Sequence, residues 1–202
     1  MIKKLKENTN IHPTMVIAVF DLETTGLPRR LGRTNYYPSD VFNAYDSARV
    51  IEMAVNIYDD DGNVVWSYST LVQPDGWVIE NSHIHGITQH MAEGGVSMKE
   101  ALDKFAEIIA GVSVLVGHNV KFDKQILMSE ARRLEHPLAQ MLCRCGYEDT
   151  MFMGETIYQL SKWPRLGDLY TRVTGNTTDQ THRALGDVQL CAACYFGLRD
   201  KQ

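Results

Sequence analysis

The stretch Met15–Gly26 reads MVIAVFDLETTG, and it decides the fold class. Its first half, Met15–Phe20, is a short apolar run rich in β-branched residues, which is typical of a buried strand. Asp21 and Glu23 follow this run, and the Thr-Thr-Gly after them indicates a turn. We therefore expect a central strand that ends in two carboxylates.

Strand-like and helical segments follow in a mixed order. Val50–Tyr58 and Val64–Val72 are strand-like, and the Asp-Gly between them is typical of a hairpin. Ser113–Gly117 is a further buried strand that leads into a helix from about Asn119 to Leu134. The sheet is therefore expected to have both antiparallel and parallel parts, as in an α/β fold.

Helical spacing marks the remaining elements. Ser97 and Glu100 resemble a capping box, and apolar residues recur at helix spacing from Ala101 until about Gly111. Further helices are predicted around Gly154–Ser161, Leu166–Thr174 and Arg183–Leu198. Leu27–Ser47 has no steady period and reads as a long loop.

The composition excludes several classes of protein. The 202 residues carry 20 Lys and Arg against 25 Asp and Glu, a formal net charge of −5, which argues against a strongly basic nucleic-acid-coating surface. Hydrophobic residues at 44% and charged residues at 22% are typical of one globular domain. Four cysteines are too few for a disulfide scaffold. Since no apolar run approaches the roughly 20 residues of a membrane span, we expect a soluble, cytoplasmic protein without a membrane partner.

Asp21 and Glu23 are the first candidate site residues. Because these residues are two positions apart on a strand, their side chains should lie on the same face and repel each other. A cation would relieve that repulsion, and oxygen ligands suit Mg²⁺ or Mn²⁺. A solvated strand end with two unrelated acids remains the alternative. Asp123 enters a helix just after a strand, so it either reaches the same edge of the sheet or stabilises the positive end of that helix.

Asp187 lies on the otherwise apolar stripe of the last helix. A buried carboxylate needs a cation or hydrogen-bond donors, which favours a metal site, whereas Cys191 and Cys194 on the same stripe read as core residues. His182 lies about 140° away around a helix of 3.6 residues per turn, so it belongs at the helix entrance. The polar stretch Thr177–Thr181 before it would let its imidazole swing over a site and accept a proton from water; an exposed cap histidine is the alternative.

Three motifs together resemble those of the DnaQ-like exonuclease family in residues, order and spacing. They are Asp21–Gly26 (DLETTG), His118–Asp123 (HNVKFD) and His182–Asp187 (HRALGD). Ile51–Ala54 (IEMA) and Ile84–Thr88 (IHGIT) resemble further stretches of the family. The last histidine marks its DEDDh branch, in which the chain most resembles the epsilon proofreading subunits of bacterial replicative DNA polymerases. The chain is also similar to ribonuclease T and oligoribonuclease, which are relatives in that branch.

The resemblance implies a ribonuclease H-like fold, a mixed sheet of about five strands with helices on both faces. One exonuclease domain would fill residues 1–202, with a core from about 16 to 198 and an inserted loop at 27–47. The carboxylates of Asp21, Glu23, Asp123 and Asp187 would hold two Mg²⁺ or Mn²⁺ ions, and His182 would be the general base.

The implied activity is a 3′→5′ exonuclease that releases nucleoside 5′-monophosphates from the 3′ ends of single-stranded DNA. It would serve proofreading or repair, either alone or with a polymerase partner. The alternatives are a 3′→5′ exoribonuclease that trims or degrades RNA, since the same chemistry attacks either phosphodiester, and an inert member that only binds. An incomplete set of acids would have favoured the inert member, and the set is complete.

The resemblance also implies substrate contacts. The terminal nucleotide would lie beside the first motif and the His-Gly-Ile segment, while two residues of the second motif would support the metal ligands or pack beneath them. These residues are Thr24, Thr25, His85, Ile87, Asn119 and Phe122. The arginines and aromatic residues of 29–45 suit phosphates and unpaired bases. That segment either clamps the substrate strand or is a surface loop packed by its own aromatic side chains.

Overall fold

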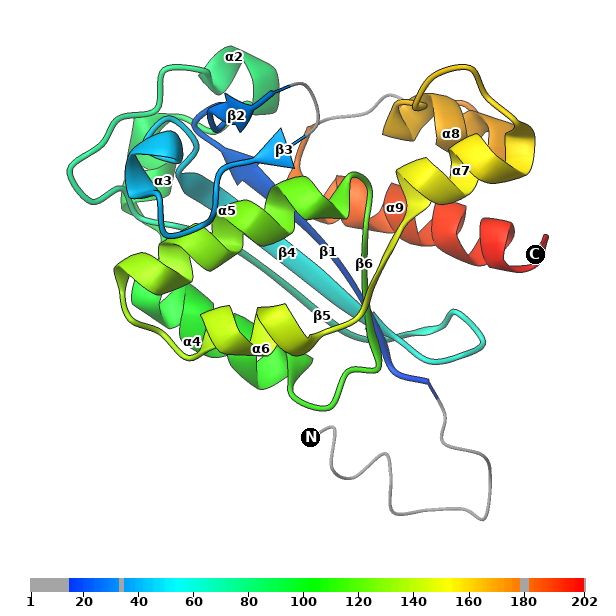
Figure 1. Cartoon of the computed structure of the whole chain (residues 1–202), viewed down its shortest axis with the longest axis horizontal. Helices are drawn as coiled ribbons and strands as arrows, with labels where there is room; N and C mark the ends of the chain where they lie inside the picture. The colour runs from blue at the N-terminus through cyan, green and yellow to red at the C-terminus, as the bar shows by residue number, and fades with distance from the viewer. Residues whose placement is uncertain (1–14, 33–34, 179–181, 202) are drawn as a thin grey trace.

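A computed structural model describes residues 15–32, 35–178 and 182–201 of the chain. Its main sheet has five strands in the order β5-β4-β1-β6-β7. β4 is antiparallel to its neighbours β1 and β5, whereas β6 is parallel to β1 and to β7. The five-stranded mixed sheet expected from the sequence is confirmed (Figure 1). The strands are β1 (Ile17–Thr24), β4 (Val50–Tyr58), β5 (Val64–Leu71), β6 (Val114–Gly117) and β7 (Tyr147–Asp149).

Helices cover both faces of this sheet, as expected (Figure 1). One face packs against α4, α5 and α6, and the other against α8 and α9. The helices are α2 (Ser82–His85), α3 (Gln89–Glu93), α4 (Met98–Ile109), α5 (Val120–Arg133), α6 (Leu138–Arg144), α7 (Thr150–Tyr158), α8 (Leu166–Thr174) and α9 (Ala184–Arg199).

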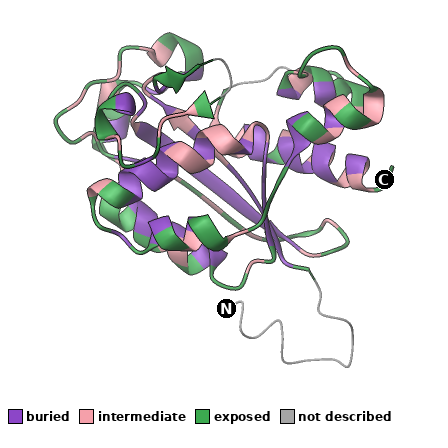
Figure 2. Cartoon of the chain, in the orientation of Figure 1, coloured by how far each residue is buried: buried purple, intermediate pink, exposed green. Residues whose placement is uncertain are grey.

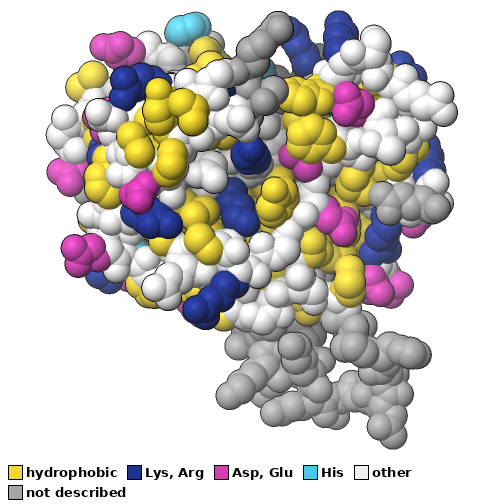
Figure 3. Space-filling view, in the orientation of Figure 1, with side chains coloured by type: hydrophobic (Ala, Val, Ile, Leu, Met, Phe, Trp, Pro, Cys, Tyr) yellow, Lys and Arg dark blue, Asp and Glu magenta, His cyan; other side chains and the backbone are white. Residues whose placement is uncertain are grey.

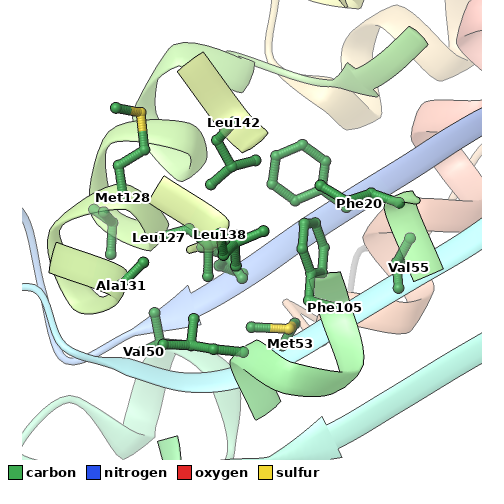
Figure 4. Close-up of a cluster of buried hydrophobic side chains, with 14 of the residues drawn as sticks. Phe20, Val50, Met53, Val55, Phe105, Leu127, Met128, Ala131, Leu138 and Leu142 are labelled. Atoms are coloured by element: carbon green, nitrogen blue, oxygen red, sulfur yellow. The ribbon is translucent and has the colours of Figure 1, made fainter. Parts of the chain in front are cut away.

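The alternation of side chains along β1 builds the two halves of the core. Ala18 and Phe20 point into the cluster with α4, α5 and α6, where Phe105 meets Phe20 edge to face at 5.4 Å (Figure 4). Ile17 and Val19 point the other way, into the cluster with α8 and α9. Since both faces of β1 are buried, the strand is apolar throughout its first half (Figure 2).

Several sequence predictions hold. The capping box of Ser97 and Glu100 starts α4, and Cys191 and Cys194 are buried in the core. The hairpin between β4 and β5 also forms, with Gly62 in the left-handed region at a φ of 84°.

Other boundaries were wrong. β1 continues beyond Phe20 to Thr24, because it keeps pairing with β4 through the acidic residues. α7 begins at Thr150 rather than at Gly154, because the Asp149 side chain accepts a hydrogen bond from the Met151 N–H and caps the helix. The short elements β7, α6, α2 and α3 were not predicted.

The inserted loop at 27–47 is partly structured and is attached to α5. Its β2 (Arg30–Leu31) pairs with β3 (Asn35–Tyr36), and a 3₁₀ turn follows at Phe42–Ala44. Tyr45 is fully buried in the core, and its hydroxyl donates to the carbonyl of Tyr37. Arg133 at the end of α5 donates to the Phe42 carbonyl (2.7 Å) and to the Asp46 carboxylate (2.6 Å). Tyr45 and Arg133 thus anchor the 37–46 part of the insertion to the core and to the end of α5.

Among the residues that the structure describes, no helix combines the length and the apolar character needed to cross a membrane.

Candidate active site

Three of the predicted carboxylates meet at one point. Asp21 and Glu23 project from β1, and Asp187 comes from the first turn of α9, which packs on that face of the sheet. One carboxylate oxygen from each lies within 4.8 Å of the others. The period-2 geometry of β1 and the apolar stripe of α9 therefore bring together residues 166 positions apart, since 187 − 21 is 166.

Asp123 approaches the same cluster from the other side of the sheet. It lies in the first turn of α5, and only 3% of its surface is exposed. After burial itself, the charge of Asp123 is the largest influence that raises the pKa of Asp21. The structure thus brings all four predicted carboxylates into one electrostatic group.

Crowding makes this group costly to ionise in the absence of a cation. Burial and then the charges of Asp187 and Glu52 raise the pKa of Glu23 to about 8, and Arg183 opposes the shift. Burial also raises the pKa values of Asp21 and Asp123 well above their usual range. A divalent cation would remove this penalty, and three oxygen donors already lie within reach of one another. The donor set fits a hard divalent ion such as Mg²⁺ or Mn²⁺.

Glu52 is a further acidic residue that sequence analysis quoted only as part of a secondary stretch. It stands directly opposite Glu23 in the β1–β4 register and is 3% exposed. Its carboxylate accepts hydrogen bonds from Arg183 Nε and Nη2 (2.6–3.2 Å) and from the Ala184 backbone N–H (2.9 Å). The signal in the sequence was a charged residue inside a nine-residue strand that is buried throughout.

His182 lies at the entrance of α9, as predicted. It is exposed, and its φ of 49° places it in the left-handed region. The next residue, Arg183, is held by Glu52, so the chain just after His182 has a fixed position beside the carboxylates. Of the polar stretch expected to let His182 swing, residues 179–181 lie outside the described part of the chain.

The histidine of the second motif has a different environment. His118 is held between the Thr150 hydroxyl (2.9 Å) and the Pro164 carbonyl (3.1 Å). Burial lowers the pKa of this imidazole to about 4, so it is neutral at physiological pH. Its contacts join β6 to the segment before α8, which is a structural role.

The predicted substrate residues near β1 form one hydrogen-bonded group. Asn81 donates to the Thr24 carbonyl (3.1 Å) and contacts His85 Nε2 (3.2 Å), while His85 Nδ1 accepts from the Ile87 N–H (3.0 Å). Ile87 is fully buried and packs against Ile51, and the nucleotide contact expected for it stays a prediction. His85 is 2% exposed, and both of its ring nitrogens are in hydrogen-bond contact with other residues of the protein, Asn81 and Ile87. Its role in the structure is therefore to hold the segment next to the end of β1 in place.

Thr25 ties the end of β1 to the segment before β4. Its hydroxyl donates to the Ser47 carbonyl (3.2 Å) and accepts from the Arg49 N–H (2.9 Å). Thr24 is 8% exposed, and its hydroxyl donates to the Gly26 carbonyl (2.8 Å). Both hydroxyls are therefore engaged in shaping the turn after β1.

Asn119 and Phe122 line the Asp123 side of the cluster. Asn119 has a φ of 63°, a left-handed conformation that asparagine tolerates, and its N–H donates to Asp149 (2.9 Å). Phe122 is half-buried and meets the ring of Tyr36 edge to face at 6.2 Å. Asp149 was missed by sequence analysis, because its role depends on the short strand β7 lying next to β6.

The sequence of the chain is similar to those of known exonuclease and DNA polymerase III proteins. A family model described as exonuclease matches residues 18–195. The PolC-type DNA polymerase III of Clostridium perfringens is 31% identical over 180 residues, which cover 86% of this chain but 10% of that protein. The DNA polymerase III subunit epsilon of Treponema pallidum is 28% identical over 189 residues, covering 90% of this chain and 75% of that protein. The chain thus spans about a tenth of the length of the PolC-type relative.

The fold is also that of solved exonuclease structures. Escherichia coli exonuclease I in complex with a dA16 oligonucleotide superposes with a TM-score of 0.72 at 20% identity, over 93% of this chain and 41% of that one. This likeness concerns the fold alone. Since the family model spans residues 18–195 and takes in all three motifs, the chain belongs to the DnaQ-like family of 3′→5′ exonucleases.

Proposed function

We propose that the protein removes nucleotides one at a time from the 3′ ends of single-stranded DNA and releases nucleoside 5′-monophosphates. The observation that carries this proposal is the convergence of Asp21, Glu23 and Asp187 within 4.8 Å, with Asp123 beside them. Four carboxylates held together at the cost of mutual repulsion suit the binding of two Mg²⁺ or Mn²⁺ ions.

The acidic residues would hold the ions, and the ions would supply positive charge to the reaction. When bound, two divalent cations supply the positive charge that activates the attacking water and stabilises the departing 3′ oxygen. β1 presents Asp21 and Glu23 from the sheet, while α5 and α9 present Asp123 and Asp187 from opposite faces. The ligands therefore come from rigid elements rather than from loops.

His182 is the proposed general base. An imidazole nitrogen would accept the proton of the attacking water. Its exposure leaves it accessible to solvent and substrate, and the bond from Arg183 to Glu52 limits the movement of its backbone. The carboxylate of Glu52 thereby helps to position the proposed base, because it holds the residue that follows His182.

Single-stranded DNA is the proposed substrate, because similar proteins are DNA polymerase subunits or are bound to DNA in their solved structures. Exonuclease I was solved with an oligonucleotide of deoxyadenosine, and the epsilon and PolC-type relatives are named for DNA polymerase III. The DNA polymerase III relatives support a proposed role in proofreading with a polymerase partner, and a role in DNA repair is the other proposal.

A cleavage assay tests the proposal. The full chain is incubated with 5′-labelled single-stranded DNA and with matched RNA, in Mg²⁺, Mn²⁺ or EDTA. A metal-dependent ladder that shortens from the 3′ end, faster on DNA, is expected from the wild type. Asp187→Ala should abolish it, and Asp61→Asn in the exposed β4–β5 turn, which also removes one negative charge, should not.

Two outcomes would overturn parts of this proposal. Faster cleavage of RNA would replace the DNA substrate by RNA and make the protein an exoribonuclease. A ladder that persists in EDTA, or in Asp187→Ala, would contradict the metal-dependent mechanism.

A further inference from the structure

The hairpin formed by β2 and β3 pairs a cation with a phenol. Arg30 and Tyr36 are directly paired in this hairpin. The guanidinium of Arg30 lies 5.3 Å from the centre of the Tyr36 ring, and its Nη2 contacts the Tyr36 hydroxyl at 3.5 Å. The two side chains therefore form one unit with a positive charge next to a phenol.

This unit lies against the second motif. Figure 1 shows β3 above the first turns of α5, and the Tyr36 ring packs edge to face on Phe122, one residue before Asp123. Burial raises the pKa of Tyr36, while Arg30 and a hydrogen bond with the Asn119 side chain oppose that shift and Asp123 adds to it. The phenol thus lies within electrostatic reach of a proposed metal ligand.

Arg29, the neighbouring arginine of the insertion, contacts other residues of the insertion instead of the second motif. Arg29 donates to Asn43 (2.8 Å) and lies over the ring of Tyr37 at 5.8 Å, so it ties the insertion together. The following segment is anchored by buried Tyr45 and by Arg133. The insertion therefore has an anchored base and a hairpin whose side chains reach the active site.

A nucleic acid strand needs such a local cation here. The chain has a net charge of −5, and on the face shown in Figure 3 the Lys and Arg side chains are scattered among other groups rather than gathered in one patch. A guanidinium presents paired N–H donors that match phosphate oxygens, and a phenol adds another donor. The resemblance to the family implies that the terminal nucleotide lies beside Thr24 and Thr25 at the end of β1, and the retained part of the strand is assigned to the Asp123 side, which Phe122 and Tyr36 border.

We propose that Arg30 and Tyr36 bind a backbone phosphate of the substrate strand, at the first linkage on the 5′ side of the scissile one. This inference rests on the proposed function, because it takes a single-stranded nucleic acid as the occupant. It assigns the hairpin of the insertion to substrate recognition, and the remainder of the insertion to holding that hairpin in place.

The test removes the charge from each partner in turn. Arg30→Ala is compared with wild type on an oligonucleotide with normal linkages and on one whose proposed linkage is a neutral methylphosphonate. Wild type should lose about tenfold in kcat/KM on the modified oligonucleotide, and Arg30→Ala about tenfold on the normal one. Arg30→Ala should lose nothing more on the modified oligonucleotide, because the contact is already absent.

Matched variants separate this contact from general charge and from folding. Arg29→Ala removes the same charge one residue away and should respond to the modification like wild type. Tyr36→Phe keeps the ring and should lose part of the affinity, and Arg30→Lys covers the case in which Arg30→Ala does not fold. Equal losses in Arg29→Ala and Arg30→Ala, or independent losses from Arg30→Ala and the methylphosphonate, would overturn the proposal.

A binding measurement keeps the inference separate from the proposed function. Anisotropy of a fluorescein-labelled oligo-dT strand is followed at several salt concentrations, with Ca²⁺ in place of Mg²⁺. Loss of one phosphate contact should reduce the slope of log affinity against log salt by about 0.7 in Arg30→Ala. Absence of cleavage by wild type would contradict the proposed function, whereas an unchanged slope would contradict the role of Arg30.

Discussion

Glu52 and Arg183 form an ion pair between residues 131 positions apart, with Nη2 and Oε1 separated by 2.6 Å. The pair joins the middle of the sheet to the entrance of α9. Glu52 lies opposite Glu23 in the sheet, and Arg183 follows His182 in the chain. One salt bridge therefore sets the distance between a proposed metal ligand and the proposed base.

Glu52→Gln should lower kcat about tenfold while KM changes by less than about twofold, because misplacing a base by a fraction of an ångström affects the chemical step. The amide keeps the shape of the carboxylate but loses the charge that holds Arg183. Steady-state kinetics on single-stranded DNA measure both constants.

Glu130→Gln is the control for that experiment. Glu130 is 2% exposed and pairs with Arg49 at 2.6 Å, so the same change breaks a comparable ion pair elsewhere. It should cost about 1–3 kcal/mol of unfolding free energy with little change in kcat. An equal fall in kcat would mean that stability, not the position of His182, explains the effect of Glu52→Gln.

Metal binding should stabilise the protein through the acidic cluster. At Mg²⁺ 100 times above its Kd, each bound ion should add about 2.7 kcal/mol to the unfolding free energy of the wild type. Asp21→Asn should lose most of this gain, yet be more stable than wild type in EDTA by about 1 kcal/mol, because it removes a carboxyl group that is costly to bury beside other acids. Urea unfolding with and without Mg²⁺ measures both effects, and Asp61→Asn should behave like wild type.

The stability of the metal-free protein should fall as the pH rises. The pKa of Glu23 is about 8 in the folded protein against an ordinary value of 4.5, so between these values the folded state keeps a proton that the unfolded chain has lost. The contribution is complete below pH 4.5 and is lost as the pH passes 8. The raised pKa values of Asp21 and Asp123 act in the same direction.

Urea unfolding in EDTA between pH 5.5 and 8.5 measures this trend. Glu23→Gln should show a weaker decline, since its amide does not titrate. Stability that increases with pH in EDTA would show that the cluster is not strained by its charges.

Gly154→Ala tests the packing of α7 on α8. A Cβ at Gly154 would lie 2.6 Å from Leu169 Cδ1, and Leu169 is fully buried. The overpacking should cost about 1–3 kcal/mol in urea unfolding. Gly146→Ala is the matched control, because a Cβ there meets nothing within 4 Å; an equal loss in both variants would contradict the packing explanation.

Local patterns predicted the parts of the site that depend on local geometry. The period of β1 put Asp21 and Glu23 on one face, and the stripe of α9 put Asp187 inside, since strand and helix periods follow from the sequence alone. Glu52 was not given a role, because its partners are more than 130 residues away. The same limit applies to Ile87, whose burial depends on contacts with β4 and α3.

The missed elements were short or lacked a period. β7 has three residues and α6 has seven, which is too few to show periodicity. In the insertion, Tyr36 points to the second motif while Tyr45 points into the core, and no local pattern separates these two uses of the same residue type.

The insertion contacts α5 near both of its ends, at Phe122 and at Arg133. The 14 residues of this helix, about 20 Å long, therefore fix the distance between the two contacts. Changing the number of residues between Tyr37 and Phe42 would shift the β2–β3 hairpin along α5, while the proposed acidic metal ligands would stay in place. Loop length can therefore change the proposed contact with the substrate strand without changing hydrolysis. Hydrolysis depends instead on the identity of the acidic side chains.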